Sequence, residues 1–442
     1  MPQTRPMPRI DSTPGVPGRP RVVAASWSVV AVFALSGFMF ASWVSRIPAV
    51  RDDLSLSPAT IGLILLVGSI GSVGALPLTG AVVTRLGTRR TVVVAATIAA
   101  IGYVLVVGGF LLGSVPAMAV AMAIANVGVA GWDVAMNIEG AMVEQGLGRA
   151  IMPVYHAGFS GGTVLGAAIG ALMARLDVPL QVHLPVAMGL ALLAVVVSVR
   201  WFLPEEGGTP HAATTPEGGG VGADAVGGHG GTGEEKVSAR ATFAAWLEPR
   251  TLLIGLVVLS AALTEGAAND WLSLASIESF DLTNSDAALM LTVFLVAMTV
   301  MRFIGTRLLD VFGRVVVLRF CIASALAGLL LFGLAPSVPL GIVGIVLWGL
   351  GAALGFPVGM SAASDDPKHA AARVSVVSTI GYTAFLAGPP LLGLLAEHVG
   401  YANALLAITV PLLISLFLTG ATRPLPGSVG AVVDPADADR EP

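Results

Sequence analysis

Long apolar runs alternate with short polar breaks along almost the whole chain. Each run covers about 20 residues or more, which is the length that a helix needs to cross the hydrocarbon core of a bilayer. The runs are continuously apolar and do not alternate in segments of about 10 residues, as the strands of a membrane barrel do. The pattern therefore predicts an all-α membrane protein with twelve transmembrane helices. The predicted spans are residues 23–45, 58–83, 91–112, 116–140, 153–175, 180–203, 250–274, 286–309, 316–335, 338–361, 374–396 and 401–420.

A polar segment separates the predicted spans into two sets of six. Residues 204–248 are rich in Gly, Thr, Ala and charged residues, and such a composition cannot bury enough apolar surface to fold. We therefore expect a flexible linker there. The predicted organisation is a tail (1–22), a six-helix bundle (23–203), the linker (204–248), a second six-helix bundle (249–421) and a second tail (422–442).

The positions of Lys and Arg predict the orientation, because these residues are enriched in cytoplasmic loops. If the N-terminus is cytoplasmic, only Arg46, Arg51 and Arg175 of the 23 basic residues lie in outer loops or at outer span ends. We therefore expect a protein of the cell (inner) membrane, with both termini and the linker in the cytoplasm.

Composition excludes several classes of function. The chain is 55% hydrophobic and 11% charged, with a net charge of -4 and no basic tract that would indicate nucleic acid as a partner. Its one cysteine, Cys321, lies in an apolar run, so neither a disulfide framework nor a Cys/His metal site is expected. Nothing resembles the ATP-binding sequence Gly-x-x-x-x-Gly-Lys-[Ser/Thr]. We therefore expect no cofactor and no bound metal.

The two halves repeat a short sequence that joins the first span of each half to the second. The repeat predicts two pseudo-symmetric bundles, with Ser57 or Ser285 as the N-cap of the helix that follows. The residues Trp43, Ser45, Asp53, Leu54, Ser57 and Ala59 recur 228 positions later as Trp271, Ser273, Asp281, Leu282, Ser285 and Ala287.

Two loops carry a recognisable motif. The sequences "GAVVTRLGTRR" (Gly80 to Arg90) and "TRLLDVFGR" (Thr306 to Arg314) resemble the signature Gly-x-x-x-Asp-Arg-x-Gly-Arg-Arg of the major facilitator superfamily and its weaker second copy. The first copy has Thr84 where the family has Asp, and Gly305 of the second is one position out of place. In the family, this Asp and its arginines latch the halves on the cytoplasmic side, so Thr84 implies a weaker first latch. The matching residues are Gly80, Arg85, Gly87, Arg89 and Arg90 in the first copy and Asp310, Gly313 and Arg314 in the second.

Other short sequences resemble one branch of that family. "WDVAMNIEGAMVEQ", "MPVYHAGFSGG", "EGAANDW" and "GYTAFLAGPPLLG" are similar to the branch that contains fucose permease. The resemblance covers all twelve spans. It implies two rocking bundles around a central cavity, alternating access, coupling to protons and a sugar-like substrate.

Polar residues inside the predicted spans indicate where such a site would lie. Asn126, Asp133 and Asn137 share one face of a helix, and Glu144 continues it. An ionised side chain near the bilayer centre costs at least about 2.5 kcal/mol and should face a partner or a watery cavity. Asp133 is therefore either a proton site or one half of a structural pair with a buried arginine such as Arg302.

Glu265 is a second candidate, one turn before Asn269 on the same helix face. With Trp271, these residues could bind a hydroxylated or cationic solute. For Trp271 and its counterpart Trp43, we favour a place in the aromatic belt at the membrane surface. His156 is either a proton relay to Asp133 or a residue with local hydrogen bonds. The expected proton-coupling residues are Asp133, Glu265 and His156, and the expected substrate-binding residues are Asn126, Asn137, Glu265, Asn269 and Trp271.

The favoured function is a secondary transporter of a small organic solute, coupled to protons, with a sugar-like substrate. Export of drugs or metabolites is the alternative, because few polar groups are available for a sugar site. A membrane enzyme is not expected, since His156, Asp133 and the serines are too scattered to form a catalytic site. A sensor without transport is also disfavoured, because the linker is too Gly-rich to be a soluble domain. The expected partners are the solute, protons and the lipid bilayer, and we expect a monomer.

Overall fold

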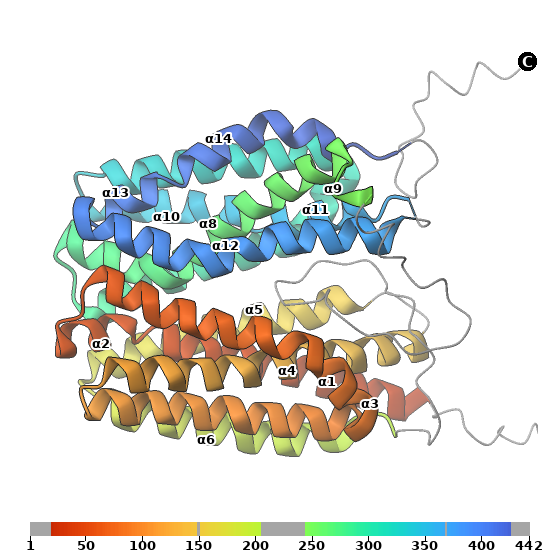
Figure 1. Ribbon diagram of the computed structural model, residues 1–442, viewed down its shortest axis with the longest axis horizontal. Helices are drawn as coiled ribbons and strands as arrows, with labels where there is room; N and C mark the ends of the chain where they lie inside the picture. Colours follow the sequence, from red (N-terminus) through yellow and green to blue (C-terminus); the bar gives the residue numbers. More distant parts are fainter. Residues whose placement is uncertain (1–18, 148–150, 205–243, 367–368, 426–442) are drawn as a thin grey trace, which may run out of the picture.

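The computed structural model describes residues 19–147, 151–204, 244–366 and 369–425, and its helices form two bundles that lie side by side (Figure 1). Most of the predicted linker and both predicted tails fall outside these residues. The first bundle contains α1 (Arg19–Val44), α2 (Ile47–Leu54), α3 (Pro58–Leu111), α4 (Val115–Leu147), α5 (Met152–Arg175), α6 (Leu180–Ser198) and η1 (Val199–Trp201). The second contains α8 (Pro249–Phe280), α9 (Asn284–Leu334), α10 (Val338–Ala352), α11 (Gly355–Ala363), α12 (Ala370–Val399), α13 (Tyr401–Leu406), α14 (Thr409–Leu418) and η2 (Thr419–Thr422).

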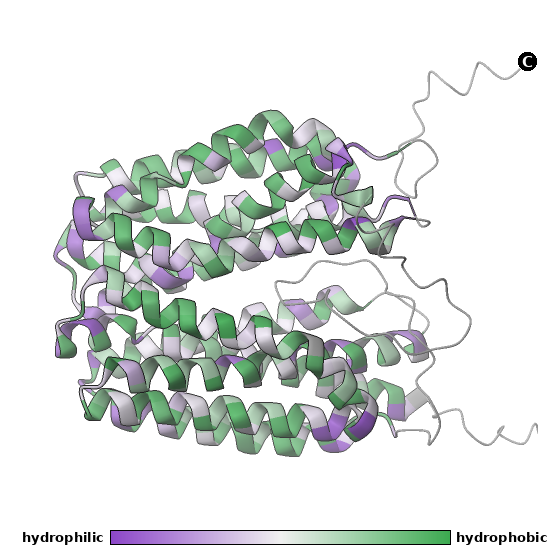
Figure 2. Cartoon of the chain, viewed as in Figure 1, coloured by the Kyte–Doolittle hydropathy of each residue, from purple (hydrophilic) through white to green (hydrophobic). Residues whose placement is uncertain are grey.

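The described residues contain 11 helices that are long and apolar enough to cross a membrane. One of them, α9, has 51 residues, more than twice what a bilayer core of about 30 Å requires, and it changes direction at Gly313. Counting its two arms separately gives twelve spans, so the predicted twelve-helix fold is confirmed. Hydrophobic residues cover the helices along their length, and the hydrophilic ones are concentrated at the two ends (Figure 2).

Gly87 and Gly313 turn the chain in the same way in the two bundles. Their backbone angles are φ 78°, ψ 166° and φ 74°, ψ 164°, a conformation that only glycine adopts without strain. Each glycine therefore lets a long helix reverse within one residue, which explains its place in the motif. We call the end of the molecule that carries these two turns the motif end, and the other the opposite end.

The predicted N-caps are half correct. Ser57 accepts a hydrogen bond from the backbone N–H of Thr60 at 3.3 Å, as expected. The prediction for Ser285 is wrong, because α9 begins at Asn284 and the hydroxyl of Thr283 accepts from the N–H of Asp286 at 3.2 Å. The helix begins slightly earlier than the sequence repeat implies, so the capping position moves with it.

Glycines allow α1 and α5 to pack backbone against backbone. A Cβ atom at Gly162 would overlap the carbonyl oxygen of Ala34, and one at Gly37 would overlap that of Phe159. Small residues at such positions let membrane helices approach closely. This contact holds α5, which carries one wall of the candidate site, in a fixed position.

Candidate functional site

A cavity of about 1060 Å³ lies between α5 of the first bundle and α9 and α11 of the second. It reaches the motif end, since Asp310, Gly313 and Arg314 are part of its wall. The polar and charged residues that line it are His156, Ser160, Thr299, Arg302, Thr306, Asp310, Arg314, Ser361 and Arg423.

A buried ion pair stands beside this cavity. Glu265 of α8 accepts hydrogen bonds on both carboxylate oxygens from Nη2 of Arg302 on α9, each at 3.1 Å. The side chain of Glu265 is 6% exposed and that of Arg302 is 18% exposed, so the arginine is the partner that faces the cavity. A charge buried this deeply is tolerated because its partner compensates it.

Arg302 also joins the two bundles. Its Nη1 donates to the hydroxyl of Ser160 on α5 at 3.1 Å, and its Nε donates to the carbonyl of Ala353 at 3.4 Å. One guanidinium therefore contacts a carboxylate of its own bundle and a hydroxyl of the other. A change in the charge of Glu265 would therefore alter the hydrogen bonding of Arg302 at the interface between the bundles.

The alternative that Asp133 pairs with Arg302 is wrong, because Arg302 pairs with Glu265. Asp133 and Asn137 lie one turn apart, as predicted: the Asn137 amide donates to the backbone carbonyl of Asp133 at 2.9 Å and to its Oδ1 at 3.4 Å. The other carboxylate oxygen of Asp133 has no hydrogen-bond partner among the described residues. A proton-carrying role for Asp133 stays a prediction.

The other acidic residues of α4 have structural partners. Glu139 is fully buried and accepts from the hydroxyl of Thr88 at 2.6 Å and from the N–H of Leu203 at 2.8 Å. Glu144 accepts from the first backbone N–H groups of α5, including that of Met152 at 2.7 Å. These two carboxylates therefore hold helix ends in place.

The residues expected to bind a sugar are not brought together at the cavity. Asn126 donates to the carbonyl of Met122 at 3.0 Å and contacts Ser72 of α3. Asn137 contacts Asp133, Asn269 is half-buried on α8, and neither is part of the cavity wall. Of the expected substrate-binding residues, Glu265 is the one that forms a hydrogen bond to a residue of that wall within the described part of the chain.

The favoured interpretation of Trp43 and Trp271 as surface-belt residues is also wrong. Their exposed fractions are 4% and 1%. Trp43 packs against Tyr103 with ring centroids 6.3 Å apart, and Trp271 packs against Tyr401 at 5.8 Å. Both indoles therefore lie inside the protein near the opposite end, covered by aromatic rings from other helices.

His156 lies in the cavity wall with Arg302 and Ser160. Its ring packs edge-on against Phe33 of α1, with centroids 5.1 Å apart. The structure thus brings His156 to the same wall as the Glu265–Arg302 pair. The expected alternatives for His156 were a proton relay to Asp133 and a residue with local hydrogen bonds, and both stay predictions.

The two motif loops differ in their contacts. In the first, Arg85, Arg89 and Arg90 are exposed, and the Thr84 hydroxyl donates to the carbonyl of Gly80 in its own helix at 2.6 Å. In the second, Asp310 is exposed.

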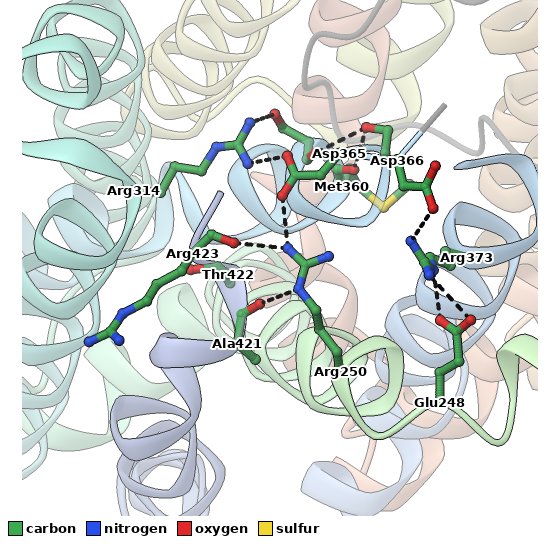
Figure 3. A network of polar contacts seen from close by, with 12 residues as sticks. Glu248, Arg250, Arg314, Met360, Asp365, Asp366, Arg373, Ala421, Thr422 and Arg423 are labelled. Carbon is green, nitrogen blue, oxygen red and sulfur yellow. Dashed lines mark hydrogen bonds and ion pairs between the residues drawn. The ribbon is translucent and has the colours of Figure 1, made fainter. Parts of the chain in front are cut away.

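Arg314 of the second loop has its partners within its own bundle. It pairs with Asp365 and donates to the hydroxyl of Ser361 at 2.9 Å. Asp365 also pairs with Arg250 of α8 at 2.8 Å, and Arg250 donates to the carbonyl of Ala421 at 3.0 Å (Figure 3). In this conformation Arg314 therefore fastens helices of one bundle, and it does not form the latch between halves that the resemblance implied.

The same end of the molecule carries a pair that should respond to acid. Glu248 accepts from Nε of Arg373 at 2.6 Å (Figure 3), and this hydrogen bond holds the pKa of the carboxyl below its usual value. The stabilisation is present above the usual pKa of about 4.3 and is lost as the pH falls through the lowered folded value. We expect the unfolding temperature of Glu248→Gln to lie below that of the wild type near pH 7, and we expect the gap to narrow only as the pH falls below about 4.3 and to close below the lowered folded pKa. Asp281→Asn, at an exposed helix end, is the control, and a gap that stays constant as the pH falls from about 7 to about 3 would contradict the prediction.

The bundles are joined at the opposite end. The N–H of Ala59 on α3 donates to Oε2 of Glu397 on α12 at 3.2 Å, and the Arg51 guanidinium lies 6.0 Å from the centre of the Tyr401 ring. In this structure the cavity therefore reaches the motif end, and the two bundles are in contact at the opposite end.

Pro389 contributes to this junction. Proline has no N–H, so the carbonyl of Phe385, four residues earlier on α12, has no helical donor. The hydroxyl of Ser69 on α3 lies 3.1 Å from that carbonyl and equally far from the carbonyl of Leu65 in its own helix, so its one proton is shared between the two acceptors. A proline in one bundle thus creates the acceptor that the other bundle uses.

Removing an opposite-end contact should shift the conformational equilibrium. Glu397→Ala removes the acceptor for the Ala59 N–H, and we expect a larger fraction of molecules open at the opposite end. Distances between spin labels on α3 and α12 at that end would measure the shift. Asn403→Ala is the control, because Asn403 is exposed and donates to Val399 one turn earlier. Equal distance distributions in both variants would contradict the prediction.

Comparison with known proteins places this architecture in a family. The family model described as Major Facilitator Superfamily matches residues 26–275 and 254–440. An uncharacterized transporter of Sinorhizobium fredii (strain NBRC 101917 / NGR234), y4wD, is 32% identical over 401 residues, which are 87% of this chain and 97% of the relative.

Solved structures with the same fold include two transporters. The E. coli fucose:proton symporter has a TM-score of 0.63 at 14% identity, over 92% of this chain and 100% of that one. The nucleoside transporter NupG has a TM-score of 0.70 at 15% identity, over 90% of this chain and 99% of that one (D323A mutant). Because the family model matches most of the chain and the Sinorhizobium relative is similar along almost its whole length, this chain belongs to the major facilitator superfamily and is a multi-pass membrane transporter.

Proposed function

We propose that the chain is a proton-coupled secondary transporter of a small, hydroxylated, sugar-like solute, working by alternating access between its two bundles in the cell (inner) membrane. The proposal rests on the Glu265–Arg302–Ser160 network. Arg302 lines the cavity and contacts the other bundle through Ser160, and it is paired with the ionisable carboxylate of Glu265. The proposed orientation has both termini in the cytoplasm, and the proposed working unit is the monomer.

Glu265 is the favoured coupling residue. When Glu265 accepts a proton, it loses the charge that compensates Arg302, and the guanidinium becomes available to another acceptor. When the proton leaves, the pair forms again and that acceptor is displaced. Loading and release of the solute are thereby linked to loading and release of the proton.

Asp133 and His156 are the secondary candidates. Asp133 is a buried carboxylate in the first bundle, and His156 stands in the wall beside Arg302. Either could pass a proton toward the cavity.

The side chains of the cavity wall favour a hydroxylated solute and disfavour a lipophilic cation. It offers hydroxyl groups from Ser160, Thr299, Thr306 and Ser361 as hydrogen-bond partners. The wall contains Arg302, Arg314 and Arg423 but one acidic residue, Asp310, among the described residues, so it offers a positively charged drug few anionic partners. The similarity in fold to a fucose:proton symporter and a nucleoside transporter agrees with a hydroxylated solute. Export of a metabolite is the second candidate, since the same cavity serves either direction.

Proton flux in proteoliposomes tests the proposal. Vesicles loaded with a pH-sensitive dye receive the purified full chain and a panel of sugars, polyols and lipophilic cations, with the pH gradient imposed in either direction. We expect a sugar or polyol to move with protons, and we expect Glu265→Gln to exchange the solute without moving protons. Asp281→Asn is the matched carboxylate control. Solute movement without proton flux in the wild type would overturn the coupling, and a response to cations alone would overturn the solute class.

A further inference from the structure

We infer that the solute carries a carboxylate group, and that this group replaces the Glu265 carboxylate on the Arg302 guanidinium when Glu265 is protonated. The inference rests on the proposed function and narrows its substrate class to small hydroxylated acids.

Basic residues outnumber acidic ones in the cavity wall. Arg302, Arg314 and Arg423 line it, together with His156, whereas Asp310 is its one acidic residue among the described part of the chain. The carboxylates that balance two of the arginines lie behind them: the side chains of Glu265 and Asp365 are 6% and 2% exposed. A solute in the cavity therefore meets guanidinium groups more readily than carboxylates.

Within the part of the chain that the structure describes, the guanidinium of Arg302 has a free donor beside its bond to Ser160. Nη2 already holds the two oxygens of one carboxylate, each at 3.1 Å. Nη1 has two N–H groups, and the hydroxyl of Ser160 is the one acceptor that it has among the described residues. The cavity-facing side of the guanidinium thus keeps a donor for an incoming acceptor, and charge-assisted bonds of this kind are strong and directional.

Protonation of Glu265 makes a negatively charged solute a better partner for Arg302 than a neutral one. A protonated Glu265 leaves Arg302, whose side chain is 18% exposed, as a partly buried charge without compensation, which is unfavourable. A sugar hydroxyl supplies an acceptor but no charge, whereas a solute carboxylate supplies both. Protonation of Glu265 and binding of a carboxylate therefore favour each other, and by linkage the effect is reciprocal.

The other charged and titratable groups around the pair agree with this exchange. His156 of α5 lies in the same wall, and it adds positive charge when protonated. Arg314 and Asp310 of α9 stand nearer the motif end, where Arg314 is held by Asp365. One proton and one carboxylate then cross together, so the transported charge is zero for a monocarboxylate.

Binding to the purified full chain in detergent tests the inference without any gradient. The probes are matched pairs that differ in the acidic group: galacturonate and galactose, gluconate and sorbitol, lactate and lactamide. Ligand that binds the folded state raises the unfolding temperature. We expect at least one acid to bind tenfold or more tightly than its neutral match, and more tightly at pH 5.5 than at pH 7.5.

Two variants locate the effect. Glu265→Gln imitates the protonated residue, so we expect it to keep the preference for the acid and to lose most of the pH dependence. The double variant E265Q/R302Q carries neither charge and avoids an unpaired buried group, and we expect it to bind acid and neutral probes alike. Equal binding of every matched pair by the wild type, or an acid preference that survives in E265Q/R302Q, would overturn the inference. A transporter that moves neutral sugars with protons would overturn it too, while leaving the proposed function intact.

Discussion

Arg302→Ala is expected to abolish proton-coupled transport and to lower the free energy of unfolding by about 3–5 kcal/mol, which is the usual cost of breaking a buried ion pair by removing one partner. The substitution leaves the carboxylate of Glu265 without the Nη2 group that contacts both its oxygens, and it removes the donor to Ser160. Thermal unfolding in detergent and proton flux in proteoliposomes measure the two effects.

The double variant E265Q/R302Q separates stability from transport. With both charges removed, no unpaired charge is buried, so most of the lost stability should return while transport stays absent. Arg307→Ala is the control, since Arg307 is an exposed arginine on the same helix. Arg302→Ala with wild-type transport would remove the pair from the mechanism. A double variant as unstable as the single one would show that the cost has another origin.

Gly162→Leu is expected to destabilise the first bundle, at or above the upper end of the roughly 1–3 kcal/mol that overpacking usually costs. Even the first atom of the new side chain would overlap the carbonyl oxygen of Ala34, which is backbone and cannot rotate away. The two helices must then separate, and the contact between α1 and α5 is lost along its length. Yield of monodisperse protein and unfolding temperature are the measurements.

The neighbouring glycine provides a closely matched control. Gly161 precedes Gly162 in the same helix, but a Cβ atom there would meet no heavy atom within 4 Å. Gly161→Leu should therefore fold like the wild type, although both substitutions change helix propensity by the same amount. If both variants lose stability equally, the close contact between α1 and α5 is not the cause.

The spans could be predicted from the sequence because each is determined locally. A run of about 20 apolar residues has to be a helix in a bilayer, whatever its neighbours are. The turns at Gly87 and Gly313 can also be predicted from the sequence, because the motif keeps glycine at the positions where a positive φ is required.

The partner of Arg302 could not be predicted in the same way. Asp133 and Glu265 are both acidic residues inside apolar spans, and nothing in either span says which one faces α9. The rotation of each helix about its own axis decides this, and that rotation follows from packing over many residues. The sequence offered a useful signal in Arg302 itself, an arginine near the middle of an apolar run, which is rare unless it is paired.

Trp43 and Trp271 illustrate a second limit. Tryptophan near the end of a span usually lies at the membrane surface, and this rule gave the wrong environment here. The rings that cover the two indoles, Tyr103 and Tyr401, are 60 and 130 positions away in the sequence. Distant contacts of this kind leave no local pattern.

Pro389 of α12 bears on how easily the junction at the opposite end opens during the transport cycle. When the bundles separate at the opposite end, the hydroxyl of Ser69 leaves the carbonyl of Phe385, and water entering the gap can take its place. A hydrogen bond that is exchanged for one to water changes the free energy by only about 0.5–1.5 kcal/mol. This hydrogen bond therefore stabilises the closed junction of α3 and α12 by a small amount, and its exchange for water adds little to the barrier for opening.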